Sequence, residues 1–258
     1  MLLESDIIPF NLSSPLGNKI IVLSPHPDDE ILGCGGTIRL LINSKKNIKV
    51  IFLTSGDKAD SSNPASYMRH DEEHITDYSK MREKEAVNSL RVLGISDYEF
   101  LRFPDRSLDR LYDSVLERLF AIIREYKPDT IYSPSTIELN PDHRTTAKLS
   151  LEIQRTMTGH EGYEPVKLVF YEVTTPLRPN MLIDITSVYT IKRKAIKRYK
   201  SQLKIRDYLK LITALNALRS LTVDGARYVE AFWCADKPLN SEDVIKWLSY
   251  QRAISEHL

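Results

Sequence analysis

The chain has 258 residues, of which 42% are hydrophobic, 28% charged and 9% aromatic. These values are ordinary for a globular protein built around one large domain, and they exclude a low-complexity chain. The formal net charge of +1 provides no general attraction to nucleic acid, membrane surfaces or acidic proteins, so no nucleic-acid partner is expected. The two cysteines, Cys34 and Cys234, are too few for a disulfide framework or a paired-cysteine zinc motif.

Membrane and export signals are not visible in the sequence. No apolar run approaches the roughly 20 residues that a transmembrane helix needs. The first fifteen residues lack the basic segment and apolar core of a secretory signal. We therefore expect a soluble protein of the reducing cytoplasm, with no transmembrane segment.

Apolar runs alternate with helical patterns over the first two thirds of the chain. Strands are expected at 19–23, 47–54, 98–103, 129–133, 167–173 and 181–185. Helices are expected at 31–42, 80–93, 108–126 and from about 141 to 156, and a long polar loop at 57–78. Repeated strand–helix units predict an α/β fold, with a mostly parallel sheet and helices on both faces.

The pattern changes near residue 187. Two basic helices, a strand at 227–233 and a final helix from about Ser241 are expected after this point. No linker separates the two parts, so we predict a single domain over 1–258, with a core at about 17–186 and a C-terminal extension at about 187–258.

Polar side chains crowd the turns that follow two of the expected strands. The first apolar run is followed by HPDDE, from His26 to Glu30, and the fourth strand by NPDH, from Asn140 to His143. Ligands of open α/β sheets bind outside the carboxyl ends of the strands, which is where both groups lie. One site built from both groups is therefore predicted.

These residue types are suited to metal-assisted hydrolysis. A catalytic zinc site has three protein ligands and an open position for water. His26 and Asp29 are three residues apart in one turn and can face one ion, and His143 can supply the third ligand. Asp28 would then lie beside the open position and accept a proton from the attacking water.

Two further carboxylates, Glu30 and Asp142, are expected to hydrogen-bond the ligand imidazoles and fix their tautomers. Each polar residue also has an ordinary structural role when it is taken alone. Asp28 and Asp29 can stabilise a helix N-terminus, and Asn140 is a good N-cap before a proline. Their joint placement after two strands favours a site.

The segment SPHPDDEILGCGGT at 24–37, together with PDHR at 141–144, resembles the LmbE/PIG-L family of metal-dependent de-N-acetylases. Smaller pieces follow in that family's order: TSGDK at 54–58, RxxEA at 82–86, LG at 93–94, FPD at 103–105, YxSQL at 199–203 and YVEAF at 228–232. The resemblance covers most of the chain.

The resemblance implies a Rossmann-like fold and a site that removes acetyl groups from N-acetylglucosamine-type sugars, as small molecules or glycoconjugates. Carried over by position, His26, Asp29 and His143 bind the metal and Asp28 is the general base. Arg82 and Asp105 match positions that contact the sugar. The metal is zinc or another divalent ion such as Fe²⁺, because the ligand set suits several. Relatives often assemble, so a homo-oligomer is also implied.

One position departs from the family pattern. The family commonly has HPDH where this chain has NPDH, so that Asn140 replaces a histidine. An asparagine can donate a hydrogen bond to an oxyanion but cannot donate a proton. We therefore expect Asp28 to act as both base and acid, with Asn140 as an oxyanion donor or helix cap. His70 or His74 could substitute for the missing histidine.

Two other functions stay open on the sequence alone: a metal-dependent phosphoesterase, which usually requires a second metal site, and a non-catalytic sugar-binding protein. The segment 192–206 carries eight basic residues and no acidic one. It is interpreted as a solvated helix face, and alternatively as a binding surface for an anionic group on the substrate.

Overall fold

The computed structural model of the chain describes residues 9–59, 72–158 and 165–235, without the side chains of residues 59 and 72–76. His70 and the expected C-terminal helix from Ser241 lie outside these residues, and so does the side chain of His74. Within the described ranges, no helix combines the length and apolarity needed to cross a membrane.

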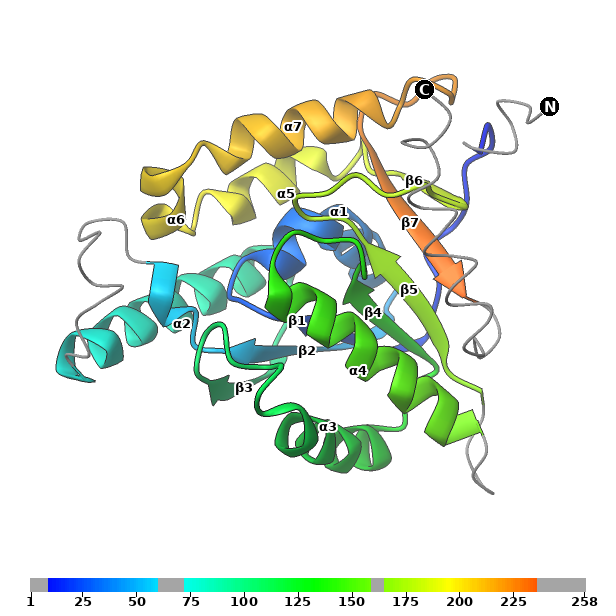
Figure 1. The fold of residues 1–258 in the computed structure, drawn as a ribbon. Coiled ribbons are helices and arrows are strands. Elements are labelled where there is room, and N and C mark those ends of the chain that lie inside the picture. Colours follow the sequence, from blue (N-terminus) through cyan, green and yellow to red (C-terminus); the bar gives the residue numbers. More distant parts are fainter. Residues whose placement is uncertain (1–8, 60–71, 159–164, 236–258) are drawn as a thin grey trace, which may run out of the picture.

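A seven-stranded sheet forms the centre of the molecule (Figure 1). Its spatial order is β3-β2-β1-β4-β5-β7-β6. The strands are β1 Lys19–Ser24, β2 Asn47–Thr54, β3 Asp97–Phe103, β4 Thr130–Pro134, β5 Lys167–Tyr171, β6 Met181–Asp184 and β7 Val229–Ala235. Strands β1 to β5 pair in parallel, whereas β7 runs antiparallel to both β5 and β6. The predicted mostly parallel sheet is confirmed.

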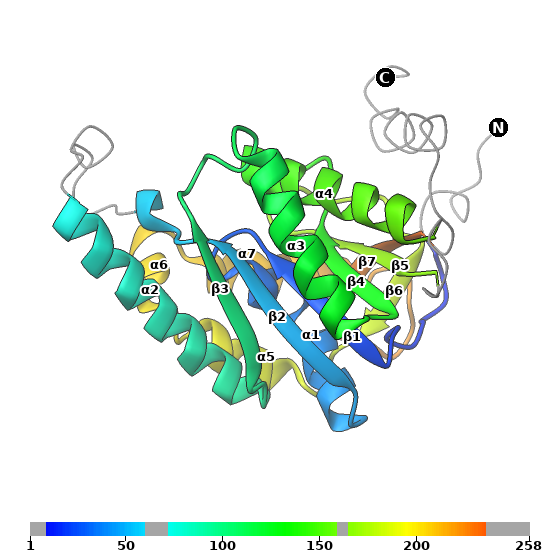
Figure 2. The same ribbon diagram turned by 90° about the horizontal axis from the view of Figure 1, so that it is seen from below.

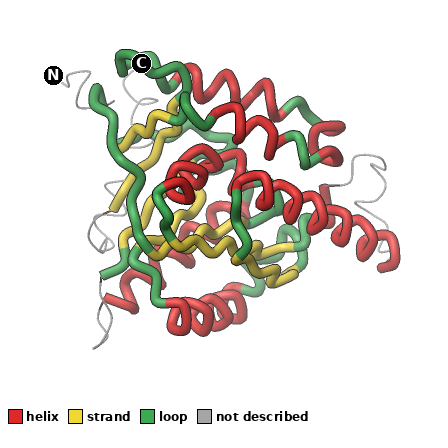
Figure 3. Tube along the Cα trace, turned by 180° about the vertical axis from the view of Figure 1, so that it is seen from behind, coloured by secondary structure: helices red, strands yellow, loops and turns green. Residues whose placement is uncertain are grey.

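Helices cover both faces of the sheet (Figures 2 and 3). They are α1 Asp29–Asn43, α2 Glu72–Leu93, α3 Tyr112–Tyr126, α4 Pro141–Thr158, α5 Tyr189–Ile196, α6 Lys200–Ile205 and α7 Tyr208–Leu218, with a short 3-10 helix at Asp57–Ala59. Helices α1, α2 and α5 pack on one face and α3 and α4 on the other. Helices α6 and α7 continue from α5 on its side of the sheet (Figure 1).

The side chains of β1 show why this strand is central. Residues Ile20 to Leu23 are completely buried, because helices cover both faces. Successive side chains point to opposite faces, so Ile20 and Val22 join the core with α1, α2 and α5, whereas Ile21 and Leu23 join the core with α3 and α4. The strand that leads to the HPDDE turn is thus fixed from two sides.

Helix α1 lies unusually close to the sheet. A Cβ atom at Gly33 would fall 2.2 Å from Cδ2 of Tyr171, so only glycine permits this approach. The helix is interrupted at Cys34, whose φ of −137° is not helical. The carboxylate of Glu230 on β7 accepts hydrogen bonds from the backbone N–H groups of Gly36 and Thr37 after this break, at 2.8 and 2.7 Å.

The structure corrects several expected boundaries. Helix α2 already begins at Glu72, inside the expected loop 57–78. Helix α3 begins at Tyr112 rather than at 108, because the N–H of Leu108 is bonded to Asp142 Oδ1 at 3.2 Å and belongs to a turn beside the site. Three helices rather than two lie between residue 187 and β7, and the third begins where Asp207 caps it by accepting from the N–H of Lys210.

The strand of the C-terminal extension, β7, lies between β5 and β6. The extension is therefore part of the sheet itself.

Candidate active site

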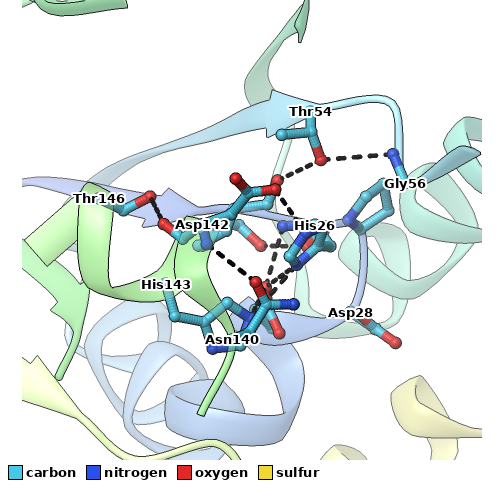
Figure 4. A network of polar contacts seen from close by, with 12 residues as sticks. His26, Asp28, Thr54, Gly56, Asn140, Asp142, His143 and Thr146 are labelled. Atoms are coloured by element: carbon cyan, nitrogen blue, oxygen red, sulfur yellow. Dashed lines mark hydrogen bonds and ion pairs between the residues drawn. The ribbon is translucent and has the colours of Figure 1, made fainter. Parts of the chain in front are cut away.

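The two polar groups meet at the carboxyl end of the parallel strands (Figure 4). His26, Asp28 and Asp29 lie between β1 and the first turn of α1, and His143 lies in the first turn of α4, after β4. All four side chains are buried, with 3 to 8% of each residue exposed. The register that pairs β1 with β4 brings together residues more than a hundred positions apart in the chain.

Three side-chain atoms form a compact triangle. Nδ1 of His26 lies 3.1 Å from Oδ2 of Asp29 and 3.2 Å from Nε2 of His143, and the last two atoms are 3.0 Å apart. Such separations are those of donor atoms around one ion with metal–ligand distances of about 2.0–2.2 Å. The structure thus brings together the three residues expected to bind a metal.

The second nitrogen of His26 is held by two carboxylates. Nε2 lies 3.1 Å from Oδ1 of Asp105 and 3.3 Å from Oδ2 of Asp142. With its proton on Nε2, the imidazole presents the lone pair of Nδ1 to the triangle. Asp142 therefore contacts an imidazole as expected, whereas Asp105, expected at the substrate, contacts His26 directly.

Asp105 and Asp142 are themselves fixed by backbone groups. Asp142 accepts from the N–H groups of Arg106 at 2.6 Å and Leu108 at 3.2 Å, and Asp105 accepts from the N–H of Lys58 at 3.2 Å. His26 and these two acids make a second cluster of metal-ligating types that shares His26 with the triangle. Because backbone donors already occupy the acids, we interpret this cluster as the support of the His26 ring.

Glu138 is a residue that the sequence reasoning missed. Its Oε2 lies 3.6 Å from Nδ1 of His143, longer than a hydrogen bond but close enough to favour a proton on Nδ1. Its carboxylate accepts from the N–H of Val173 at 2.7 Å and the hydroxyl of Thr174 at 2.6 Å. The position lies in the loop between β4 and α4, where no motif marked it.

The electrostatics of the triangle favour a bound cation. Burial opposes charge on His143, but Asp29 overcomes this effect and raises the pKa of His143 to about 9. Burial likewise opposes charge on His26, yet Asp105 and its other acidic neighbours hold the pKa of His26 well above the usual value. The pKa of Asp29 is lowered despite its burial, chiefly because of His143. The His₂Asp donor set therefore fits a divalent ion such as zinc.

Asp28 lies beside the triangle without belonging to it (Figure 4). Its backbone φ of 132° is unusual for a residue with a side chain and indicates local strain. Burial raises the pKa of Asp28 to about 7, although the nearby charge of Arg82 acts in the opposite direction. A carboxylate with this pKa can both accept and release a proton near neutral pH.

The expected role of Glu30 needs a correction. Its carboxylate accepts from the N–H of Asp28 at 3.1 Å, from the hydroxyl of Ser24 at 3.1 Å and from the hydroxyl of Tyr199. Glu30 is thus bonded around the turn that carries Asp28, whereas the imidazoles are supported by Asp105, Asp142 and Glu138. The buried start of α1 points this side chain toward Tyr199, on the face of the sheet that α1, α2 and α5 cover.

Asn140 caps α4. Its Oδ1 accepts a hydrogen bond of 2.9 Å from the N–H of Asp142, and Pro141 is the first residue of the helix. The side chain also lines the cavity above the triangle. One group of the amide is therefore engaged by the helix, and the Nδ2 group is left to donate.

The cavity above the triangle has a volume of about 390 Å³. Its wall combines the triangle and Asp28 with polar and cationic side chains from loops and from helices that include α2, α6 and α7. Among these lining residues are Lys58, Arg82, Arg106, Gln202, Arg206 and Tyr208. Arg82 and Asp105, the two residues expected to contact the substrate, both line this cavity. Arg82 also contacts Asp28, and Asp105 also contacts His26.

Comparison with known proteins places the chain in a family. Residues 21–154 match the PIG-L family, described as GlcNAc-PI de-N-acetylase, and this match covers more than half of the chain. The chain belongs to the PIG-L family. The matched region contains His26, Asp28, Asp29, Asn140 and His143.

PIG-L relatives with named activities include more than one chemistry. The diacetylchitobiose deacetylase of Thermococcus kodakarensis is 25% identical over 75% of this chain and 74% of its own. The 4-oxalmesaconate hydratase of Pseudomonas putida is 27% identical over 85% of this chain and 88% of its own. The fold matches that of the N,N'-diacetylchitobiose deacetylase of Pyrococcus horikoshii, with a TM-score of 0.73, 24% identity and coverage of 92% and 94%.

Proposed function

We propose that this protein is a metal-dependent hydrolase that removes the N-acetyl group from an amino-sugar-containing small molecule or glycoconjugate of the N-acetylglucosamine type. The observation that carries the proposal is the triangle of His26 Nδ1, Asp29 Oδ2 and His143 Nε2, with Asp28 beside it at the base of a cavity. The family and its deacetylase relatives favour the same chemistry.

The triangle would hold the divalent ion. An ion bound there would lower the pKa of a water molecule and polarise the amide carbonyl, as zinc does in hydrolases. Zinc is our proposal for its identity. His26, Asp29 and His143 orient the donor atoms, and the acids behind the two imidazoles keep the rings in the tautomers that bind metal.

Asp28 would carry the proton. Its buried carboxylate accepts a proton from the water that attacks the acetyl carbon, and then delivers it to the nitrogen of the leaving amine. The C–N bond breaks, and the products are acetate and the free amino sugar. A single residue serves both steps because Asn140 cannot donate a proton.

Asn140 would stabilise the developing oxyanion. Since its Oδ1 is bonded to the N–H of Asp142, the Nδ2 group can donate toward the cavity. Asn140 would then act both as an oxyanion donor and as the cap of α4, the two roles expected from its residue type.

The cavity suits a substrate that carries an anionic group. The side chains of Lys58, Arg106 and Arg206 line it in addition to the buried Arg82. Most of the basic segment 192–206 is solvent-exposed, but Arg206 at its end reaches the cavity. We propose that a carboxylate or phosphate of the substrate binds among these cations.

The same cations support a second candidate, the addition of water to an unsaturated polycarboxylate. The hydratase relative from Pseudomonas putida motivates it, because its match covers 85% of this chain. A phosphoesterase is less favoured, because among the described residues the two metal-ligating clusters share His26 and do not form two separate sites.

Acetate release tests the proposal. Zinc-loaded protein is incubated with N-acetylglucosamine derivatives, including malate-, nucleotide- and aglycone-linked forms, and in parallel with 4-oxalmesaconate. We expect acetate from at least one sugar, and Asp28→Ala should reduce the rate about 10²- to 10⁴-fold while bound zinc is retained. Loss of 4-oxalmesaconate without any acetate would replace deacetylation by hydration. Turnover of none of these compounds by fully zinc-loaded protein would favour a sugar-binding protein without activity.

A further inference from the structure

A second cavity adjoins the one above the metal triangle. It has a volume of about 820 Å³, and its lining is mostly apolar. Both cavities are lined by Arg106, Asn140, Val173, Thr174, Arg206 and Tyr208. A ligand in the first cavity can therefore extend into the second past these shared walls. We call the second cavity the α7 groove.

One wall of the groove is a face of α7. Leu211, Leu215 and Leu218 lie four and three residues apart, so they form one stripe along the helix, about 10 Å long at 1.5 Å per residue. Leu211 is 48% exposed and Leu218 is 59% exposed. The lining of the groove also contains Leu139, which is 75% exposed, and Pro141.

The exposure of this face is not explained by the packing of α7. The helix has the sequence YLKLITALNAL, with one charged residue, yet only Ile212 and Asn216 are fully buried, and Tyr208, Leu209 and Leu215 are partly buried against the core. A surface helix normally turns its charged residues to water. A contiguous apolar surface that borders a catalytic cavity marks a binding site for an apolar group.

We propose that the α7 groove binds an aliphatic chain joined glycosidically to the amino sugar of the substrate. The inference rests on the proposed function, because the sugar occupies the cavity above the triangle. The shared walls make the two spaces continuous, so the chain need not leave the protein to reach the leucine stripe. Thr174 and Arg206 line both cavities, and their polar groups can hydrogen-bond the sugar. The leucine-lined remainder of the groove favours the aliphatic chain.

The test is a binding measurement that does not depend on turnover. Methyl, butyl and hexyl glycosides of glucosamine, which carry the free amine and cannot be deacetylated, are titrated into zinc-loaded protein by calorimetry. A buried methylene strengthens binding by up to about fourfold, so we expect at least a tenfold gain from the methyl to the hexyl glycoside. Leu211→Asp should abolish this gain. Leu221→Asp is the matched control, since Leu221 is 81% exposed and lies outside the groove.

The outcomes separate this inference from the proposed function. Equal affinity for all three glycosides, or a gain that Leu211→Asp leaves intact, overturns the groove even if acetate is released in the activity assay. A gain in affinity from the methyl to the hexyl glycoside that Leu211→Asp removes and Leu221→Asp retains supports the groove. This holds even if no acetate is released in the activity assay. If there is no gain and Leu211→Asp instead lowers the molecular mass in light scattering, the stripe is a contact between two copies of the chain and the inference is overturned.

Discussion

Nη2 of Arg82 lies 3.3 Å from Oδ1 of Asp28, and 1% of Arg82 and 7% of Asp28 are exposed. The same guanidinium donates to the carbonyl of Pro27 and, at 3.4 Å, to that of Gly56. Gly56 has a φ of +61°, and a Cβ there would crowd the Arg82 guanidinium at 3.3 Å. Arg82 therefore connects the ends of β1 and β2 and places a positive charge beside the candidate base.

Replacing Arg82 by glutamine should move the acid limb of the pH profile. The positive charge of Arg82 works against the rise in the Asp28 pKa, so its removal raises this pKa further, by about one unit or more. Asp28 then stays protonated to higher pH. As the pH is lowered, the decline of kcat/KM on the acetylated substrate should therefore begin at a higher pH than in the wild-type protein. Arg82→Lys retains the charge and should keep the limb within a few tenths of a unit. If both variants change only KM and leave the limb in place, Arg82 acts on the substrate alone.

The metal-free protein should become more stable when Asp28 is replaced by asparagine. The pKa of Asp28 is about 7 in the folded protein, above its ordinary value, so the folded state binds more protons than the unfolded state between about pH 4 and 7. The contribution of Asp28 to the free energy of unfolding therefore decreases as the pH rises through that window, by up to about 4 kcal/mol. Urea unfolding of both proteins at pH 5 and pH 8 measures the difference. A larger gain for Asp28→Asn at pH 8 is expected, and equal gains at both pH values would contradict it.

Asn140 should show separable effects on stability and turnover. Asn140→Ala removes the cap of α4 and should lower the free energy of unfolding by about 1 kcal/mol, whereas Asn140→Ser retains a capping oxygen and should lose less. Asn140→His should raise deacetylase turnover several-fold at unchanged zinc content, because it adds a proton donor at the cavity. Unchanged turnover would show that Asp28 delivers the proton without a handicap.

Lys192 should behave unlike its basic neighbours. Its Nζ is completely buried and bonds Glu230 at 2.7 Å, Asn216 at 3.0 Å and the carbonyl of Leu32 at 2.9 Å. Lys192→Met leaves the buried carboxylate of Glu230 without its cation and should destabilise the fold by about 3–5 kcal/mol. Lys194→Met on the exposed face of the same helix is the control and should change stability by less than about 0.5 kcal/mol. Thermal unfolding of the two variants decides between a structural ion pair and a solvated helix face at Lys192.

The triangle of His26, Asp29 and His143 could be predicted because its signal in the sequence is local. His26 and Asp29 share one turn, and His143 lies at the start of a helix after a parallel strand, so all three are expected at the carboxyl ends of the strands. Strands β1 and β2 were predictable because they contain the apolar runs Ile20–Leu23 and Val50–Leu53. The distances of 3.0 to 3.2 Å within the triangle needed the three-dimensional structure.

Two of the supporting contacts were not predicted, for different reasons. Glu138 lies close to His143 in the chain but in a loop without a motif, whereas Asp105 reaches His26 from the turn after β3, 79 positions along the chain. The basic segment was uniform in the sequence, yet its first residue is a buried ion-pair partner and its last lines the cavity. Composition indicates charge, whereas only packing shows which charges are buried.

The position of β7 has a consequence for how the chain folds during synthesis. Strand β6 pairs only with β7 in the described sheet, and β7 is the last described strand to leave the ribosome. The segment matched by the family, with all of the proposed metal ligands, is complete at residue 154, whereas β7 ends at Ala235. Glu230 on β7 also supplies the acceptors for the interrupted helix α1. The proposed metal ligands are therefore translated well before the strand that completes the sheet, and nascent chains that stall before residue 229 present β5 and β6 with unpaired edges to the translating cell.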